Sequence, residues 1–162
     1  MTDLGDGSRR AFVLRRRLGK GFSDADVARC AEMSRQHGMR FVKLYFMVGL
    51  PGETEADLAA VGRLVKRVAR ELPTKVALTP FVPKPRTPLA NAPTPARAEL
   101  QRRLRALTRE LRRIGNVRVT AGGVAEAQVE TLLSHAGREA ADLLERGREA
   151  LRAEATRFGT RR

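Results

Sequence analysis

The order of apolar segments along the chain predicts an α/β fold. Two short apolar runs, residues 40–48 and 75–82, are each followed by a segment with apolar residues at helical spacing. Strands that alternate with helices are typical of parallel βαβ units. Because two parallel strands do not make a complete sheet, we expect the chain to be part of a larger α/β structure.

The first long helix is expected over residues 23–37. Residues 1–13 have no regular pattern and are expected to be an irregular N-terminal segment. Ser23 and Asp26, three residues apart, have the spacing of a capping box, in which each side chain binds the other residue's backbone N–H. Gly38 follows and supplies a left-handed helix stop.

The strand over residues 40–48 is the most apolar part of the chain. Seven of its nine residues, "RFVKLYFMV", are apolar without clear alternation, which favours a strand buried on both faces. A second capping box at Thr54 and Asp57 then begins a helix that Pro73 ends.

A loop rich in proline follows the strand at residues 75–82. Residues 83–95, "PKPRTPLANAPTP", contain five prolines and are therefore expected to be extended and stiff. Thr94 and Pro95 are expected to begin a helix that reaches Gly115 and carries a leucine stripe. A short edge strand at 116–121 and helices near 124–135 and 138–157 complete the chain.

The composition limits the classes of function. The net charge of +14 favours phosphate, nucleic acid or an anionic surface as a partner. One cysteine, Cys30, excludes an intrachain disulfide framework and a four-cysteine metal site, and we expect it half-buried in a helix. Neither a membrane span nor a signal peptide is recognisable, so a soluble cytoplasmic protein is expected.

The residues after each strand are candidates for a ligand site, since ligands of α/β folds bind beyond the carboxyl ends of the strands. In "GLPGET", Gly49 and Gly52 allow close approach of the backbone to a ligand. Glu53 can pair with an ammonium group or favour the helix N-terminus. The alternative is an ordinary strand-to-helix turn.

The second strand ends in "PFVPKP", where Phe81 and Val82 offer an apolar shelf beside unpaired backbone groups. A purine requires such a flat apolar surface together with hydrogen bonds at its edge. The alternative is a strand exit stiffened by proline.

These two segments carry a family resemblance. "VKLYFMVGLPGETEADL" and, one helix later, "LTPFVPKPRTPL" resemble the C-terminal half of a radical S-adenosylmethionine (radical SAM) core domain. The closest type is found beside cobalamin-binding domains and in methylthiotransferase-like enzymes. "RRRLGKGFSDADV" and "AQVETLLSHAGREAADLLE" are also similar to the family, and the resemblance covers about residues 14–145.

The resemblance implies a partial (β/α)₆ barrel fragment, comprising its last two βα units, with a helical C-terminal extension. Residues 14–114 would form the partial barrel and 115–162 a short strand and the extension. Lys20 would lie near the ribose or carboxylate end of S-adenosylmethionine. The other cofactor-binding residues implied are Met47, Val48, Gly49, Leu50, Pro51, Gly52 and Glu53 on the first rim, and Phe81, Val82 and Pro83 beside the adenine edge.

The chain departs from this family in the part that binds iron. The cluster loop Cys-x₃-Cys-x₂-Cys and the first three strands are absent from the sequence. We therefore expect no catalytic or metal-binding residue here and no reductive cleavage of S-adenosylmethionine by this chain alone. A 4Fe–4S cluster would have to come from an upstream segment, which makes a complementary N-terminal barrel half the expected partner.

Two other interpretations stay open. In the first, the chain is a catalytically inactive basic α/β module that binds RNA or another polyanion, although no aromatic platform for single strands is recognisable. Alternatively, it is a fragment without a stable fold, which would unfold non-cooperatively.

Overall fold

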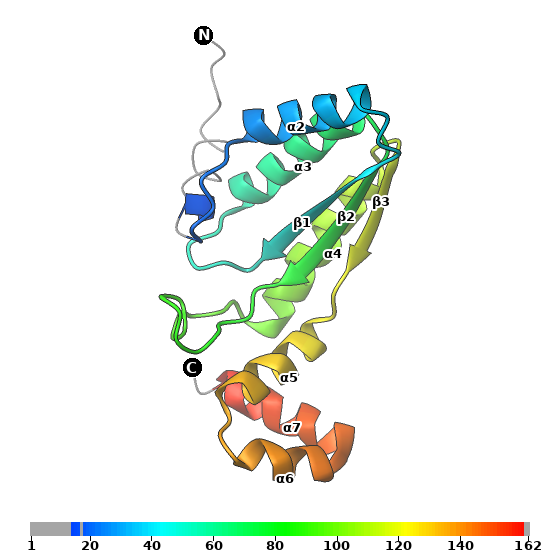
Figure 1. Ribbon diagram of the computed structural model, residues 1–162. Coiled ribbons are helices and arrows are strands. Elements are labelled where there is room, and N and C mark those ends of the chain that lie inside the picture. Colours follow the sequence, from blue (N-terminus) through cyan, green and yellow to red (C-terminus); the bar gives the residue numbers. More distant parts are fainter. Residues whose placement is uncertain (1–13, 17, 161–162) are drawn as a thin grey trace.

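The structure, a computed structural model, describes residues 14–16 and 18–160 (Figure 1). The predicted irregular segment 1–13 lies outside the described residues. The elements, in chain order, are α2 Asp24–Gln36, β1 Val42–Val48, α3 Glu55–Ala69, β2 Thr74–Pro80, α4 Arg97–Arg112, β3 Val117–Ala121, α5 Val124–His135, α6 Glu139–Glu145 and α7 Gly147–Thr160.

The three strands form one parallel sheet in the order β1-β2-β3. The register places Leu44 of β1 beside Val76 of β2, which in turn lies beside Val119 of β3. This arrangement confirms the α/β class and the short strand expected near residues 116–121.

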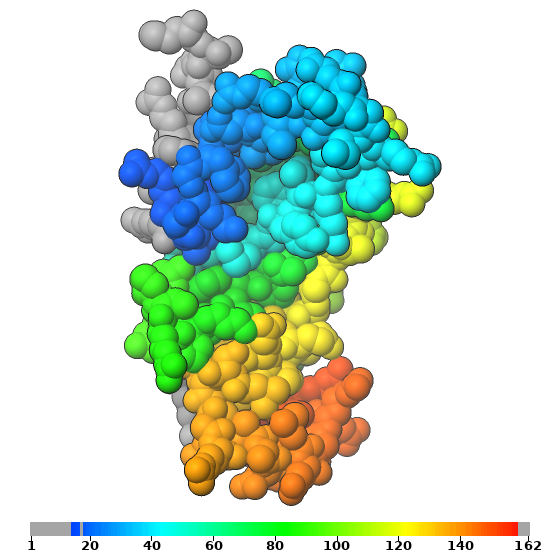
Figure 2. Space-filling model, viewed as in Figure 1, coloured from blue at the N-terminus to red at the C-terminus, as the bar shows by residue number. Residues whose placement is uncertain are grey.

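Among the residues that the structure describes, helices cover one face of this sheet and none covers the other. Alternate residues of β1, such as Leu44 and Val48, point toward the helices, whereas Lys43 and Tyr45 are exposed on the other face. Tyr45 is 69% exposed. No helix lies in front of the three strands in Figure 1, and strand atoms reach the same surface in Figure 2.

The prediction that residues 40–48 are buried on both faces is therefore wrong. The strand does alternate, but Tyr45 and Met47 occupy positions on the uncovered face, so the sequence reads as a continuous apolar run. We refer below to the uncovered side, which carries Lys43, Tyr45, Met47, Lys75, Ala77, Thr79, Arg118 and Thr120, as the open face.

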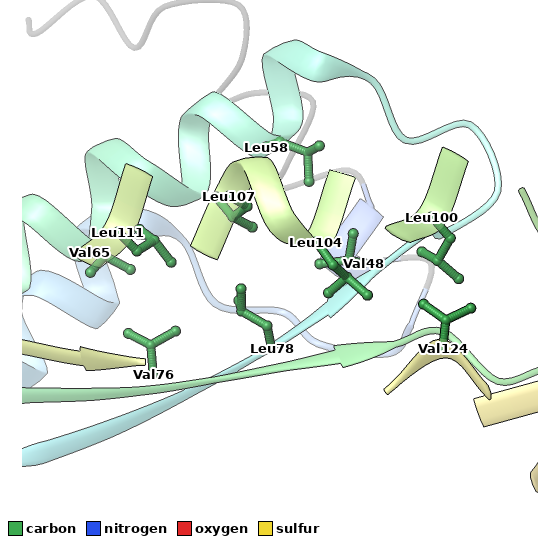
Figure 3. Packing of buried hydrophobic residues seen from close by; sticks show 10 residues of the cluster. All are labelled: Val48, Leu58, Val65, Val76, Leu78, Leu100, Leu104, Leu107, Leu111 and Val124. Carbon is green, nitrogen blue, oxygen red and sulfur yellow. The ribbon is translucent and has the colours of Figure 1, made fainter. Parts of the chain in front are cut away.

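The core lies between the covered face and helices α3 and α4. Side chains from the strands and the two helices point toward one another in this layer (Figure 3). The predicted leucine stripe of α4 is confirmed, because Leu100, Leu104, Leu107 and Leu111 are all buried. Helix α2 packs beside α3 through Ala31, which joins a second buried cluster.

Both predicted capping boxes are present. Asp26 accepts hydrogen bonds from the backbone N–H and the hydroxyl of Ser23, at 2.8 and 2.7 Å. Asp57 accepts the same pair of bonds from Thr54, also at 2.8 and 2.7 Å. These contacts fix the N-termini of α2 and α3 where the sequence predicts them.

Four details of the prediction need correction. Helix α4 begins at Arg97 with Ala96 as its N-cap, because the proline-rich loop continues through Pro95. That loop is not extended throughout as predicted, since it forms turns over residues 85–91. The expected helix over 138–157 is divided into α6 and α7 at Arg146. Cys30 is exposed, because it lies on the side of α2 away from the helix-packing residues Ala28 and Ala31.

Helices α5, α6 and α7 lie beyond the carboxyl ends of the strands (Figure 1). They follow β3 directly, through Gly122 and Gly123. Within the described part of the chain, no helix is long and apolar enough to cross a membrane. The C-terminal helices thus lie near the edge of the sheet where the sequence predicts a ligand site.

Candidate functional site

The first rim, residues 47–53 after β1, and the second rim, residues 81–83 after β2, are neighbours at the carboxyl edge of the sheet. Met47 lies beside Thr79 and Val48 beside Pro80 in the strand register. The backbone N–H of Phe81 donates to the carbonyl oxygen of Val48 at 2.8 Å. The parallel pairing of β1 and β2 therefore joins the start of one rim to the start of the other.

The buried side chain of Glu53 stabilises the turn between β1 and α3. Its carboxylate accepts a 2.7 Å hydrogen bond from the backbone N–H of Gly49, and its side chain is only 5% exposed. The backbone N–H of Glu53 also donates to the carbonyl oxygen of Leu50, at 3.0 Å. The carboxylate is thus occupied by its own turn and not presented to solvent.

Arg103 of α4 is the partner of this turn that the sequence alone did not reveal. Its guanidinium lies 3.6 Å from the Glu53 carboxylate and donates to the Glu53 carbonyl oxygen at 3.2 Å. The same guanidinium donates to Glu99 at 2.7 Å. The only related signal in the sequence is the leucine stripe of α4. It determines which face of the helix packs on the sheet, but not which residue Arg103 contacts.

The pKa of Glu53 lies above its ordinary value of 4.5, mainly because burial removes water from the carboxylate. The Gly49 N–H and the charge of Arg103 act in the opposite direction. Glu99 behaves differently: hydrogen bonds from Arg102 and Arg103 lower its pKa to about 2. Glu99 therefore keeps its charge beside Arg103 throughout the neutral range.

The two rim glycines have different surroundings. Gly49 has a φ of +92°, and a β-carbon there would lie 2.8 Å from Cδ1 of Leu100. Gly52 has a φ of +77°, and a β-carbon there would meet no atom within 4 Å. The space at Gly49 is filled by α4, so only Gly52 leaves room for a ligand at this turn.

The remaining residues of the first rim do not share one face of the sheet. The Val48 side chain is fully buried toward the helices, whereas Met47 is half-buried on the open face. Leu50 and Pro51 are half-buried in the turn. Side chains of adjacent strand residues point to opposite faces, so one ligand can touch Met47 through its side chain and Val48 only through its backbone.

The second rim borders a cavity of about 310 Å³. Phe81, which is 7% exposed, lines this cavity together with Leu100 of α4, Val124 of α5 and Phe158 of α7. Pro83 is buried and Val82 half-buried. The aromatic side chain of Phe81 thus faces the cavity and the C-terminal helices, which the sequence did not connect with this rim.

Side chains attach the proline-rich loop to α5. Lys84 forms an ion pair with Glu130 and donates to the Ser134 hydroxyl at 3.2 Å. A ring nitrogen of His135 lies 3.3 Å from the carbonyl oxygen of Ala90. The second rim is therefore held by the C-terminal helices as well as by its own prolines.

Lys20 is exposed in the segment before α2, and its backbone N–H donates to the Arg15 carbonyl oxygen at 2.9 Å. Its role beside a cofactor stays a prediction, as do the roles of the rim residues. Among the residues that the structure describes, no three His, Cys, Asp or Glu side chains cluster in a way that could hold a metal ion.

The chain resembles part of a longer protein. Over 75 residues the chain is 37% identical to an uncharacterised protein of Methanocaldococcus jannaschii. The matched region is 46% of this chain and 17% of that protein, so the chain corresponds to only a part of the relative's length. No family model and no solved structure matches the chain.

Proposed function

We propose that the chain is the carboxyl-terminal part of a radical SAM-type (β/α) barrel. In this proposal its rim binds the adenosyl part of S-adenosylmethionine once a cluster-bearing segment completes the barrel. The observation that carries the proposal is the sheet, which is parallel and has helices on one face only. This is the arrangement of the wall of a (β/α) barrel, whose strands face helices outside and a common interior inside.

The open face supports the proposal through its side chains. Tyr45 and Met47 are large apolar residues on a face without covering helices, and Tyr45 is 69% exposed. Within the described part of the chain, both outer strands, β1 and β3, also pair on one side only. An uncovered sheet with two free edges favours further strands as partners, since exposed edges are ready to pair.

The residues at the carboxyl edge fit an adenosyl group in part. Backbone groups near Gly52 are accessible, and Met47 and Thr79 lie side by side on the open face. Glu53 serves in this proposal as a positioning residue, because its carboxylate is held by Gly49 and Arg103. Bound S-adenosylmethionine would supply the sulfonium and adenosyl groups.

The residues present do not fit a 4Fe–4S cluster. Such a cluster needs several thiolates, whereas this chain has the single Cys30, exposed on α2. The cluster would have to be held by another polypeptide segment, so we derive no reaction step for this chain by itself.

Amide chemical shifts of the ¹⁵N-labelled full chain, titrated with S-adenosylmethionine, test the proposal. We expect the largest shifts in 47–53 and 81–82, because these segments form the rim. Gly52→Val should weaken the response several-fold. Gly38→Val is the matched control, since Gly38 also has a positive φ of +73° and open space but precedes β1 at the opposite edge.

Shifts confined to other regions would contradict the proposed rim. A second experiment addresses the complete protein: the chain is produced together with a segment that carries Cys-x₃-Cys-x₂-Cys. We expect a brown iron–sulfur chromophore and formation of 5′-deoxyadenosine. Absence of both would exclude a split radical SAM enzyme.

The alternative from the sequence, a basic module for RNA or another polyanion, remains a second candidate. The specific observation in its favour is a group of cations on the open face, Lys43, Lys75 and Arg118, that lie side by side in the sheet.

A further inference from the structure

A row of three cations crosses the open face of the sheet. The register places Lys43 of β1 beside Lys75 of β2, and Lys75 beside Arg118 of β3. Neighbouring strands lie about 4.8 Å apart, so these side chains leave the sheet close together. Like charges side by side in a sheet destabilise it, which makes an unneutralised row of this kind unfavourable in the free protein.

No acid in the part of the chain that the structure describes pairs with the row. Among residues 14–16 and 18–160, neither Lys43, Lys75 nor Arg118 forms an ion pair. The next row of the open face consists of Tyr45, Ala77 and Thr120, which are uncharged. The row is therefore available to an anion from outside.

Two exposed aromatic side chains lie beside these cations. The ammonium group of Lys75 lies 3.5 Å from the ring centroid of Phe41, and that of Lys43 lies 4.7 Å from the ring centroid of Tyr45. Phe41 is 46% and Tyr45 69% exposed. The sequence did not reveal this aromatic pair, because a strand expected to be buried on both faces would hide both rings.

The surface is hollowed at the amino end of the sheet. A depression of about 650 Å³ is lined by Arg40, Phe41, Lys75, Asn116 and Arg118, together with neighbouring backbone. None of the lining residues is acidic. Cations and an aromatic ring thus border the same hollow, whose size suits a nucleotide-sized group.

We infer that this surface binds single-stranded nucleic acid. Phosphate groups lie along Arg40, Lys43, Lys75 and Arg118, and a base stacks on Tyr45 or on the free side of Phe41. The inference deepens the second candidate function and applies to the chain on its own, because a complementary barrel half would enclose the open face; most of the surface lies toward the amino end of the strands, away from the proposed S-adenosylmethionine rim.

Fluorescence anisotropy of labelled single-stranded RNA and DNA oligonucleotides, measured with the full chain over a range of salt, tests this site. We expect the affinity to fall steeply with salt, because each phosphate contact contributes roughly 0.7 to the logarithmic slope for single strands. The double variant Lys75→Gln/Arg118→Gln, which removes two such contacts, should reduce that slope by about 1.4. The RNA and DNA arms show which sugar the surface prefers.

The matched control is Arg109→Gln/Arg112→Gln, which removes the same charge from exposed positions of α4, on the other side of the sheet. We expect it to leave the salt slope nearly unchanged. Tyr45→Ala should weaken binding roughly tenfold, whereas Tyr45→Phe retains the ring and should bind as the wild type does. Because all these positions are on the surface, each variant should keep the circular dichroism spectrum of the wild type.

Equal effects of the two double variants would overturn the inference, since binding would then depend on net charge alone. Equal competition by poly-glutamate and by an oligonucleotide of the same length would overturn it too, as would absence of binding at low salt. If one variant proves unstable, Arg118→Gln alone, at an exposed strand position, gives the same comparison with Arg112→Gln. Loss of oligonucleotide binding in Lys75→Gln/Arg118→Gln should leave the amide shifts caused by S-adenosylmethionine unchanged.

Discussion

Glu53 connects the chain turn after β1 to helix α4. Its carboxylate accepts from the Gly49 N–H and faces Arg103, while its side chain is almost entirely buried. Removing a buried acceptor leaves its donors without partners, which costs about 1–3 kcal/mol. The turn after β1, which the sequence predicts as a ligand contact, thus also stabilises the packing of α4 on the sheet through Glu53.

This geometry gives a first prediction for two substitutions. Glu53→Ala should lower the free energy of unfolding by about 1–3 kcal/mol, because the Gly49 N–H and Arg103 both lose their partner. Glu53→Gln should cost less, since the amide oxygen still accepts from Gly49. Urea unfolding at neutral pH measures both, and equal losses for the two variants would argue against the Gly49 hydrogen bond.

The raised pKa of Glu53 gives a second prediction, about pH. A carboxyl whose pKa is raised above 4.5 by folding contributes stability at low pH and loses it as the pH rises through the raised value. Glu53→Gln does not titrate. The unfolding free energy of the wild type, relative to this variant, should therefore decrease as the pH rises above 4.5. An increase would mean that the charge of Arg103 outweighs the effect of burial.

The two rim glycines give a third prediction. Gly49→Ala combines an unfavourable positive φ with a β-carbon 2.8 Å from Leu100, so we expect a loss of roughly 2–4 kcal/mol. Gly52→Ala has the same type of backbone conformation but open space around it, and should lose only about 1–2 kcal/mol. Thermal unfolding compares them. A similar loss of stability at both positions would show that the Leu100 side chain moves away from the added β-carbon.

At the scale of elements, α4 is the helix that organises the core. Its four buried leucines face Val48, Val76 and Leu78 of the sheet and side chains of α3 (Figure 3). The same helix carries Arg103 to the β1–α3 turn and Leu100 to Gly49 and the cavity. The shape of the rim therefore depends on how α4 lies on the sheet.

The fourth prediction concerns this packing. Leu107→Ala should destabilise the protein by about 2–5 kcal/mol, because Leu107 is only 2% exposed and its removal leaves a cavity. Leu144→Ala is the control, since Leu144 on α6 is 57% exposed and should change stability little. Denaturant unfolding measures both variants. Comparable effects would mean that α4 is not packed tightly on the sheet.

At the scale of the whole molecule, a high positive charge acts on a small core. The net charge of +14 repels itself in the compact state, and the row on the open face adds to this repulsion. The buried clusters nevertheless connect all three strands with α2, α3 and α4. We therefore expect the chain to fold as one unit, which differs from the interpretation that it is a fragment without a stable fold.

The fifth prediction follows from this balance. The isolated chain should unfold in one cooperative thermal transition, and its Tm should rise as added salt screens the repulsion between cations. Circular dichroism at increasing sodium chloride concentrations measures both. A broad, non-cooperative change at every salt concentration would favour a fragment without a stable fold.

Local patterns in the sequence determined the elements and several of their ends. The capping boxes at Ser23 and Thr54 depend on contacts within three residues, and the leucine stripe of α4 follows from helical periodicity, so both were predictable. The Thr94–Pro95 pair predicts a helix start three residues before the one observed at Arg97, because such a pair also suits the end of a loop.

Only the tertiary structure decided which face of the sheet is covered and what surrounds each rim. Tyr45 and Met47 are apolar in type, so their positions on the open face could not be read from hydropathy. The Glu53–Arg103 contact and the cation row join residues on separate elements, and depend on strand register and helix placement. Sequence fixes such contacts only through the packing of the whole core, because no short-range pattern encodes which distant side chains meet.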